Sequence, residues 1–400
     1  MSGLGQTIKI SDHDKISEMS GPIYLDYCAT TPVHPQVRDA VLPLLNEQYG
    51  NPSSMHKIGM QANILLTEAR SAVAEGLGCS KEEIYFTSGA TEADNLALFG
   101  VMRQFEPGKA HLVTTEIEHH AILHAAQQLE REGYQVSYLP VDSRGIVDPQ
   151  DLVKLIRPET KLVSVMMVNN EVGSIQPLQK IGAITSQHGI LLHTDAVQGV
   201  GLMDLDLATW HIDLLSLSAH KIYGLKGVGA LFIREGVPVL PCIYGGPQEK
   251  TIRPGTENLP GIVSLAEAVK VVGSEKQKER KRLSELRSWF IEGLRNRIEG
   301  VIINTPVHSS PHVLSVSFPG ASAEMMQVRL SRENIAVSLG SACNSKEVAP
   351  SHVLVAMGLS RGQIEGTIRI SFGYPTTQEE LENFLELIPT IWRRSKFTDD

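Results

Sequence analysis

The sequence predicts an α/β protein with a mostly parallel, doubly wound sheet and a second, smaller α+β domain. Two observations lead to this prediction. Short apolar, β-branched segments alternate with helical segments from residue 83 to residue 234, and a long charged helical segment with shorter strands and helices follows from about residue 270. Alternation of strands and helices is typical of a parallel sheet covered by helices on both faces. A chain of 400 residues is long enough for two such domains.

Seven apolar segments are expected to form the strands of the main sheet. They are residues 83–88, 111–115, 135–141, 161–168, 190–195, 214–218 and 229–234. The pattern between them predicts helices at residues 60–76, 121–132 and 150–156. Ligands of such sheets bind beyond the carboxyl ends of the strands, so residues that follow each strand are candidates for a site.

The rest of the chain predicts the second domain. Its expected elements are a helix at residues 274–298, strands at 312–318 and 367–372, and helices at 323–332 and 377–394. Thr376 and Glu379 have the spacing of a capping box, which predicts that the last helix begins there. We therefore expect a large domain at residues 33–269, a small domain at residues 21–32 and 270–400, and a mobile leader at residues 1–20.

Composition limits the classes of function. Hydrophobic content of 42% and charged content of 20% are those of an ordinary globular protein. A net charge of −9 argues against direct nucleic-acid contact, which normally requires a basic face. No membrane span or signal peptide is expected. The cysteines Cys28, Cys79, Cys242 and Cys343 are far apart, so we expect no disulfide framework or metal site, and a reducing, cytoplasmic location.

Lys221 and Asp195 are the most informative pair of residues. Each lies at or just after the end of an apolar strand. A lysine amine can form a Schiff base with an aldehyde cofactor, and a carboxylate can keep a pyridine nitrogen protonated. The pair therefore predicts a site for pyridoxal 5′-phosphate. Taken alone, Lys221 is better explained as a surface lysine after a core strand, so the prediction depends on its neighbours.

A phosphate site is expected near the same strand ends. Ala90 and Thr91 lie in a Gly/Ser-containing turn between the first strand of the sheet and a helix, where backbone N–H groups favour an anion. Ser218 and His220, next to Lys221, offer further donors. A plain strand-to-helix turn is the alternative, and on its own it is the better explanation.

Three more polar residues follow strands and suit a flat cofactor ring. His119 can stack on the ring, and Asn170 and Gln198 can hydrogen-bond a ring hydroxyl. A lone histidine is more often a polar surface residue. Several strand ends in succession carry polar groups that suit one ligand, and this favours a cofactor site.

Arg369 and Cys343 are candidates from the second domain. Arg369 lies between two isoleucines in a strand, where a guanidinium is costly to bury unless it is paired. It suits a substrate carboxylate, with a structural ion pair as an equally good alternative. Cys343 lies among Gly, Ser and Asn residues rather than core residues, which favours a reactive thiol on an exposed, mobile loop.

The chain resembles the cysteine desulfurases, which are the NifS/IscS branch of the class V aminotransferase family and of the fold-type I pyridoxal phosphate enzymes. The resemblance extends from about residue 22 to about residue 394. The motifs that carry it are Tyr24-Leu25-Asp26-Tyr27, Ala29-Thr30-Thr31-Pro32, Gly50-Asn51-Pro52, Thr87-Ser88-Gly89-Ala90-Thr91-Glu92, Glu118-His119, Asn169-Asn170-Glu171, His193-Thr194-Asp195, Ser218-Ala219-His220-Lys221, Arg253-Pro254-Gly255-Thr256-Glu257-Asn258 and Gly340-Ser341-Ala342-Cys343.

The resemblance implies a role for each matching residue. Lys221 would anchor the cofactor and move protons, Asp195 would pair with the pyridine nitrogen, and His119 would stack on the ring and act as acid or base. The phosphate would be held by Ala90, Thr91, Ser218 and His220. Asn170 and Gln198 would contact the ring hydroxyl and the substrate, and Arg369 would bind the substrate carboxylate. Thr256 would reach the phosphate of a neighbouring subunit, which implies a homodimer.

The resemblance also implies the reaction. L-cysteine would be converted to L-alanine, with the sulfur held as a persulfide on Cys343 and passed to an acceptor protein. The acceptor would serve iron–sulfur cluster assembly, tRNA thiolation or DNA phosphorothioation. Leu339 stands where the family usually has serine, and Cys28 adds a second thiol that could compete for sulfur. The chain also ends soon after Arg394, where some members carry a tail that docks the iron–sulfur scaffold.

Three alternatives stay open from the sequence. The first is a lyase that uses the same cofactor, such as a selenocysteine lyase or a cystine C–S lyase, and Cys343 argues against it. The second is a sulfur-relay binding protein without catalysis, which the intact Lys221, Asp195, His119 and Arg369 disfavour. The third is a structural α/β protein with no ligand.

Overall fold

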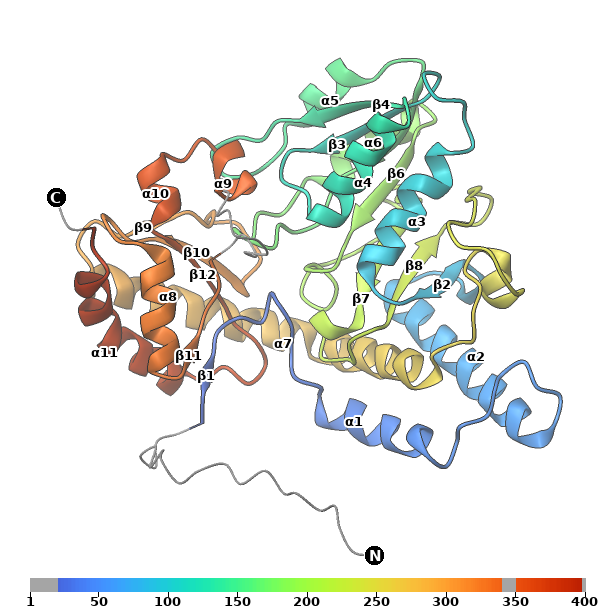
Figure 1. Cartoon of the computed structure of the whole chain (residues 1–400), viewed down its shortest axis with the longest axis horizontal. Coiled ribbons are helices and arrows are strands. Elements are labelled where there is room, and N and C mark those ends of the chain that lie inside the picture. The colour runs from blue at the N-terminus through green and yellow to red at the C-terminus, as the bar shows by residue number, and fades with distance from the viewer. Residues whose placement is uncertain (1–20, 340–349, 398–400) are drawn as a thin grey trace, which may run out of the picture.

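The computed structural model describes residues 21–339 and 350–397, and a seven-stranded sheet forms its centre (Figure 1). In spatial order the strands are β2 (Ile84–Thr87), β8 (Gly229–Ile233), β7 (Leu214–Ser218), β6 (Leu191–Asp195), β5 (Thr160–Ser164), β3 (His111–Thr115) and β4 (Gln135–Leu139). Neighbouring strands from β7 to β4 are parallel, whereas β8 is antiparallel to both β2 and β7. The predicted strands and the mostly parallel sheet are confirmed.

Helices cover both faces of this sheet, because successive side chains of a strand point to opposite faces. Val113 and Leu215 belong to the core on one face, and Leu112 and Leu214 belong to the core on the other. The first core is completed by α1 (Pro35–Val41), α2 (Lys57–Leu77), α5 (Pro149–Leu155), α6 (Leu178–Gln187) and the first part of α7 (Leu259–Arg297). The second is completed by α3 (Ala90–Met102) and α4 (His120–Arg131).

A separate core surrounds a three-stranded antiparallel sheet in the second part of the chain. The order of its strands is β12 (Thr367–Ser371), β10 (Val313–Ser317) and β9 (Ile302–Ile303). Packed with them are α8 (Ala323–Arg332), α11 (Gln378–Arg394) and the second part of α7, and the short helices α9 (His352–Ala356) and α10 (Arg361–Glu365) lie nearby in the chain. The N-terminal strand β1 (Ile23–Tyr24) joins this part, since it pairs in parallel with β11 (Ile335–Ala336).

Helix α7 is longer than the sequence predicts. The expected helix at residues 274–298 is the second half of a 39-residue helix that begins at Leu259. The Asn258 side chain caps it by accepting from the Gly261 N–H at 3.2 Å. Val269 packs in the core of the main sheet, and Leu283 packs in the core of the second part. The predicted boundary at residue 270 therefore falls inside one helix, and the division into two domains stays a prediction.

The last helix begins one residue later than the predicted capping box would place it. The Thr377 hydroxyl accepts from the Glu380 N–H at 3.2 Å, and the Glu380 carboxylate accepts from the Thr377 N–H at 2.8 Å. The Thr376 hydroxyl instead accepts from the Gly373 N–H at 2.9 Å. The assignment of the box to Thr376 and Glu379 is wrong, because adjacent threonines and adjacent glutamates give the same spacing in two registers.

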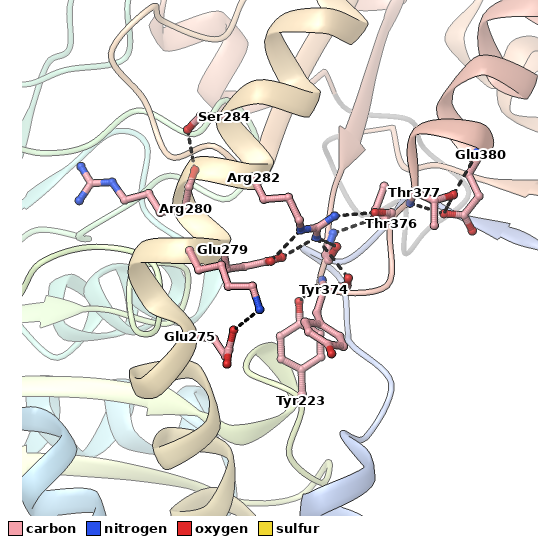
Figure 2. Close-up of polar contacts among 12 residues, drawn as sticks. Tyr223, Glu275, Glu279, Arg280, Arg282, Ser284, Tyr374, Thr376, Thr377 and Glu380 are labelled. Carbon is pink, nitrogen blue, oxygen red and sulfur yellow. Dashed lines mark hydrogen bonds and ion pairs between the residues drawn. The ribbon is translucent and has the colours of Figure 1, made fainter.

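Polar contacts tie α7 to the segment before α11, as Figure 2 shows. The Arg282 guanidinium pairs with the Glu279 carboxylate at 2.6 Å and donates to the Gly373 carbonyl oxygen at 2.8 Å. In the same region the Tyr374 N–H donates to the Tyr223 hydroxyl at 2.8 Å. Tyr223 follows β7 closely in the chain, so these bonds hold the second part of the molecule against the end of the main sheet.

Candidate active site

A cavity of about 680 Å³ lies where the carboxyl ends of the main-sheet strands face the second core. Most of the predicted site residues line it, namely Ala90, Thr91, His119, Asn170, Asp195, Gln198, Ser218, His220, Lys221 and Arg369. Two predicted residues are not among its lining residues. Cys343 lies outside the described residues, and Thr256 is exposed and does not line this cavity.

Lys221 reaches the cavity from a short 3-10 turn that follows β7 directly. Its Nζ donates to the carbonyl oxygen of Ala29 at 2.9 Å and also to that of Cys28. Burial lowers the pKa of Lys221, and the nearby charge of Arg369 lowers it further. A lower pKa raises the fraction of free amine, which is the form that attacks an aldehyde.

Asp195 is the last residue of β6, the strand beside β7. It is 6% exposed, and its Oδ1 accepts from the Val197 N–H at 2.9 Å. Burial raises its pKa to about 6, although the Val197 hydrogen bond and the Lys221 charge act in the opposite direction. A carboxylate with so little access to water is stabilised by a cationic partner, and a protonated ring nitrogen is such a partner.

The turn between β2 and α3 provides a site for an anion. Helix α3 begins after Gly89, and no side chain caps its N-terminus. Gly89 has φ +154°, a backbone conformation that residues with a side chain rarely adopt, so this turn favours glycine. Thr91 lies in the first turn of α3. His220, whose Nδ1 is 3.2 Å from the Thr30 hydroxyl, also lines the cavity. Free N–H groups at a helix N-terminus favour a phosphate.

These groups fit pyridoxal 5′-phosphate. Lys221 offers the amine for its aldehyde, Asp195 offers the carboxylate for its ring nitrogen, and the N-terminus of α3 offers donors for its phosphate. All three line one cavity.

His119 caps the N-terminus of α4, since its Nδ1 accepts from the Ala121 N–H at 3.1 Å. In the neutral ring the proton must therefore lie on Nε2. Burial lowers the pKa of His119 to about 4, and the charge of Lys221 adds to this effect. The ring is neutral near pH 7, which suits stacking on an aromatic cofactor and proton transfer through Nε2.

Arg369 is buried in the middle of β12. The sequence left two roles open for it, namely binding a substrate carboxylate and forming a structural ion pair. Its Nη2 pairs with the Asp26 carboxylate at 2.8 Å, and its Nη1 donates to the Asn170 carbonyl oxygen at 3.0 Å. Its Nε has no hydrogen-bond partner among the described residues. The structural ion pair is therefore present, but a guanidinium has five N–H donors, so donors are left for a substrate carboxylate. Asp26 was assigned no role from the sequence.

Cys28 contributes its backbone rather than its thiol. The residue is 2% exposed, and burial raises the pKa of its thiol. A protonated thiol is a much poorer nucleophile than a thiolate, so competition with Cys343 for sulfur is disfavoured. The carbonyl oxygen of Cys28 accepts from Lys221 Nζ and from Gln198 Nε2, which places it between two predicted site residues.

Two buried acids near the cavity were not predicted. Glu118 is fully buried, and its Oε1 accepts from the Met166 N–H at 2.9 Å. Asp94 on α3 lies 3.7 Å from His193 Nε2, and no hydrogen-bond partner for its carboxylate exists among the described residues. Burial raises the pKa of both, that of Glu118 to about 8. Glu118 is therefore largely neutral near pH 7. In the sequence, only the Glu118-His119 motif pointed to Glu118.

A Glu118→Gln variant should be more stable than the wild type in alkaline solution and about equally stable near pH 4. The folded pKa is about 8, whereas that of an unfolded glutamate is about 4.3, so the folded state binds the extra proton between these values. The stabilising contribution of Glu118 to the free energy of unfolding is fully present below about pH 4.3. It falls by up to about 1.4 kcal/mol per pH unit and is lost by the time the pH passes 8. Thermal unfolding from pH 4 to pH 9 measures this, and a pH-independent difference would contradict it.

The fold and this site define a pyridoxal-phosphate enzyme of the aminotransferase class, and the family model for aminotransferase class-V matches residues 23–384. "Cysteine desulfurase IscS" of Dictyoglomus turgidum is 42% identical over 374 residues, which cover 93% of this chain and 95% of that protein. A solved "NifS-like protein" has a TM-score of 0.88 and 42% identity, covering 93% of this chain and 100% of that one. A structure described as "SspA in complex with cysteine" has a TM-score of 0.79 and 36% identity, covering 88% and 98%. The chain therefore belongs to the class-V aminotransferase family and, within it, to the cysteine desulfurases of the IscS and NifS type.

Proposed function

We propose that this protein is a pyridoxal-phosphate-dependent cysteine desulfurase that converts L-cysteine to L-alanine and takes the sulfur as a persulfide on Cys343. One observation carries the proposal. Lys221 and Asp195, at the ends of neighbouring strands, line one cavity with Arg369. They supply a covalent anchor, a counter-ion for a ring nitrogen and a receptor for a carboxylate, which is what an amino-acid substrate of this cofactor requires.

When bound, the cofactor supplies an electron sink for negative charge at the α-carbon of the substrate. Lys221 would anchor it and would take the α-proton of the substrate, a role that its lowered pKa favours. Asp195 would keep the ring nitrogen protonated, and Ser218, His220 and the N-terminus of α3 would hold the phosphate. His119 lines the same cavity, where it would stack on the ring and would exchange protons through Nε2.

The substrate is held through its carboxylate. Arg369 donates to this carboxylate. Asp26 already accepts from Arg369 Nη2 at 2.8 Å, so Asp26 and the substrate must share the guanidinium. Asn170 and Gln198 contact the ring hydroxyl and the substrate. The bound cysteine of the SspA structure supports L-cysteine as the substrate of this chain.

Cys343 is the nucleophile of the sulfur transfer. Its thiolate attacks the sulfur of L-cysteine, so that an S–S bond forms while the C–S bond breaks. The bonding electrons stay on the carbon, which takes up a proton and leaves as L-alanine. Cys343 is left as a persulfide, and an acceptor protein or thiol collects the sulfur. Burial of the Cys28 thiol, which raises its pKa, supports Cys343 as the acting cysteine.

We also propose a homodimer with shared active sites. Thr256 is exposed and away from the cavity of its own chain, which fits a residue that serves the phosphate site of a partner subunit. Large apolar side chains are exposed along the segment from the end of α1 into α2, namely Leu42, Leu45, Tyr49, Met55, Ile58, Met60 and Ile64. Exposed apolar groups of this extent mark an interface. Light scattering should give about twice the chain mass of 43.7 kDa, and the mass of one chain would contradict the proposal.

The acceptor is proposed to be a protein, because a net charge of −9 opposes direct contact with nucleic acid. In the part of the chain that the structure describes, no helix combines the length and the apolar character needed to cross a membrane. We propose a cytoplasmic location, since widely separated cysteines suit a reducing compartment.

The test measures L-alanine and reductant-released sulfide from L-cysteine with the wild type and with Cys343→Ala. The yellow, cofactor-loaded wild type should form both products in equal amounts, whereas the variant should stay yellow and release little sulfide. Cys79→Ala is a matched control, because Cys79 does not line the cavity, and it should behave as the wild type. Sulfide release that persists in Cys343→Ala would indicate a selenocysteine lyase or cystine C–S lyase instead.

A further inference from the structure

Gln198 and His312 meet between the two parts of the molecule. Gln198 follows β6, and His312 directly precedes β10. Gln198 Nε2 lies 3.1 Å from the Cys28 carbonyl oxygen, and Gln198 Oε1 lies 2.9 Å from His312 Nε2. His312 Nδ1 lies 2.7 Å from the Ser310 hydroxyl. All four residues are buried, so each of these polar groups depends on the partner that it has here.

The Cys28 carbonyl shows which way the amide of Gln198 is turned. A carbonyl oxygen only accepts, so the amide atom facing it must be the NH₂ group. The amide oxygen then faces His312, and since that oxygen also only accepts, His312 Nε2 must carry a proton. His312 Nδ1 in turn accepts from the Ser310 hydroxyl. Burial lowers the pKa of His312 to about 3, and the charge of Arg287 adds to this, so the ring is neutral as this pattern requires.

The position of His312 is held from the second core. The Arg287 guanidinium, on α7, donates to the Ser310 carbonyl oxygen at 2.7 Å and to the Ser309 hydroxyl at 2.7 Å. These bonds fix the turn that carries Ser310, and Ser310 fixes the ring. The orientation of Gln198 in the main-sheet part is thus set by residues of the second part.

We propose that His312 is a positioning residue that holds the Gln198 oxygen, so that an amide N–H rather than the oxygen is presented to a ligand in the cavity. One amide N–H is used by Cys28, the oxygen is used by His312, and the second N–H is left for a ligand. The ligand atom at Gln198 is then an acceptor, and an anionic oxygen is favoured because hydrogen bonds to charged groups are stronger. This inference rests on the proposed function, in which that atom is the ring oxygen of the cofactor.

His312→Leu and His312→Gln test the proposal together. Leucine removes the donor to Gln198, whereas glutamine carries an amide N–H at a reach similar to that of Nε2. In the cofactor-loaded protein, a pH titration of the visible absorbance gives the pKa of the bound cofactor. We expect this pKa to rise by about one unit in His312→Leu, because a weakened donor stabilises the ring oxygen anion less, and to stay near the wild-type value in His312→Gln. An unchanged pKa in a folded His312→Leu would overturn the proposal.

A second measurement needs neither cofactor nor activity. Histidines of the full chain are labelled with ¹⁵N, and the signals of His312 are identified by their loss in His312→Gln. Two-bond ¹H–¹⁵N correlations should show a neutral ring protonated on Nε2, and a ring protonated on Nδ1 would overturn the proposal. A wild type that fails to bind pyridoxal phosphate would overturn the proposed function instead, while the tautomer result still decides the role of His312.

Discussion

Lys221→Ala should form L-alanine from L-cysteine about 10⁴-fold more slowly than the wild type, or not at all, because one side chain is both the anchor of the cofactor and the base for the α-proton. Its place at the end of β7 puts the amine in the same cavity as Asp195. Lys226 also lines this cavity, but it is exposed, so it lacks the burial that lowers the pKa of Lys221. We expect no substitute for Lys221 among the described residues.

Dialysis followed by an absorbance spectrum and a product assay measures this effect. The wild type should stay yellow, whereas Lys221→Ala should lose the cofactor because nothing holds it covalently. Lys154→Ala is the matched control, since the Lys154 side chain on α5 is 73% exposed and does not line the cavity. A Lys221→Ala protein that stays yellow and turns over would remove Lys221 from the mechanism.

Arg369→Leu should lower kcat/KM for L-cysteine by about 10²-fold or more, mainly through a higher KM. Two hydrogen bonds from a guanidinium to a carboxylate are worth about 1.5–3 kcal/mol each, and leucine offers none. The buried ion pair with Asp26 provides a competing, structural explanation for Arg369. Asp26 is more exposed than Arg369, at 21% against 7% of the side chain, so water can solvate its carboxylate once the arginine is gone.

Steady-state kinetics and thermal unfolding together separate the two explanations. Arg361→Leu is the control, because it removes an arginine from an ion pair with Glu365 whose arginine side chain is 92% exposed. It should change neither KM nor stability by much, since exposed pairs contribute about 0–1 kcal/mol. If Arg369→Leu left KM unchanged and lowered only the stability, Arg369 would be a structural residue.

The local sequence pattern was sufficient to predict most of the secondary structure. A strand buried on both faces reads as an apolar β-branched segment, and β3 and β7 were predicted to the residue for this reason. The same alternation placed Lys221 and Asp195 at strand ends, and parallel strands bring their carboxyl ends to one edge of the sheet. Residues with a local signal therefore converge in the cavity as predicted. The start of α7 was missed, because its cap at Asn258 lies in a loop-like segment rich in Pro and Gly.

The partners of the site residues could not be predicted in this way. Asp26 and Arg369 are 343 positions apart, and Gln198 and His312 are 114 apart, yet each pair is in direct contact. No periodicity links such positions, since their proximity depends on how the segment after β1 packs beside β12 and how the segment before β10 packs against the main sheet. The pKa values of Asp195, Glu118 and His119 likewise depend on burial, which is a property of the packed molecule.

The sequence by itself determined the fold class, the strand ends and the chemical groups that meet there, because these depend on side-chain type and on neighbours a few positions away. Only the tertiary structure decided that Arg369 is shared with Asp26, that Cys28 presents its carbonyl rather than its thiol, and that His312 turns the amide of Gln198. Hydrogen-bond direction and protonation are set by the nearest groups in space and by the exclusion of water, and both appear only when distant segments pack together.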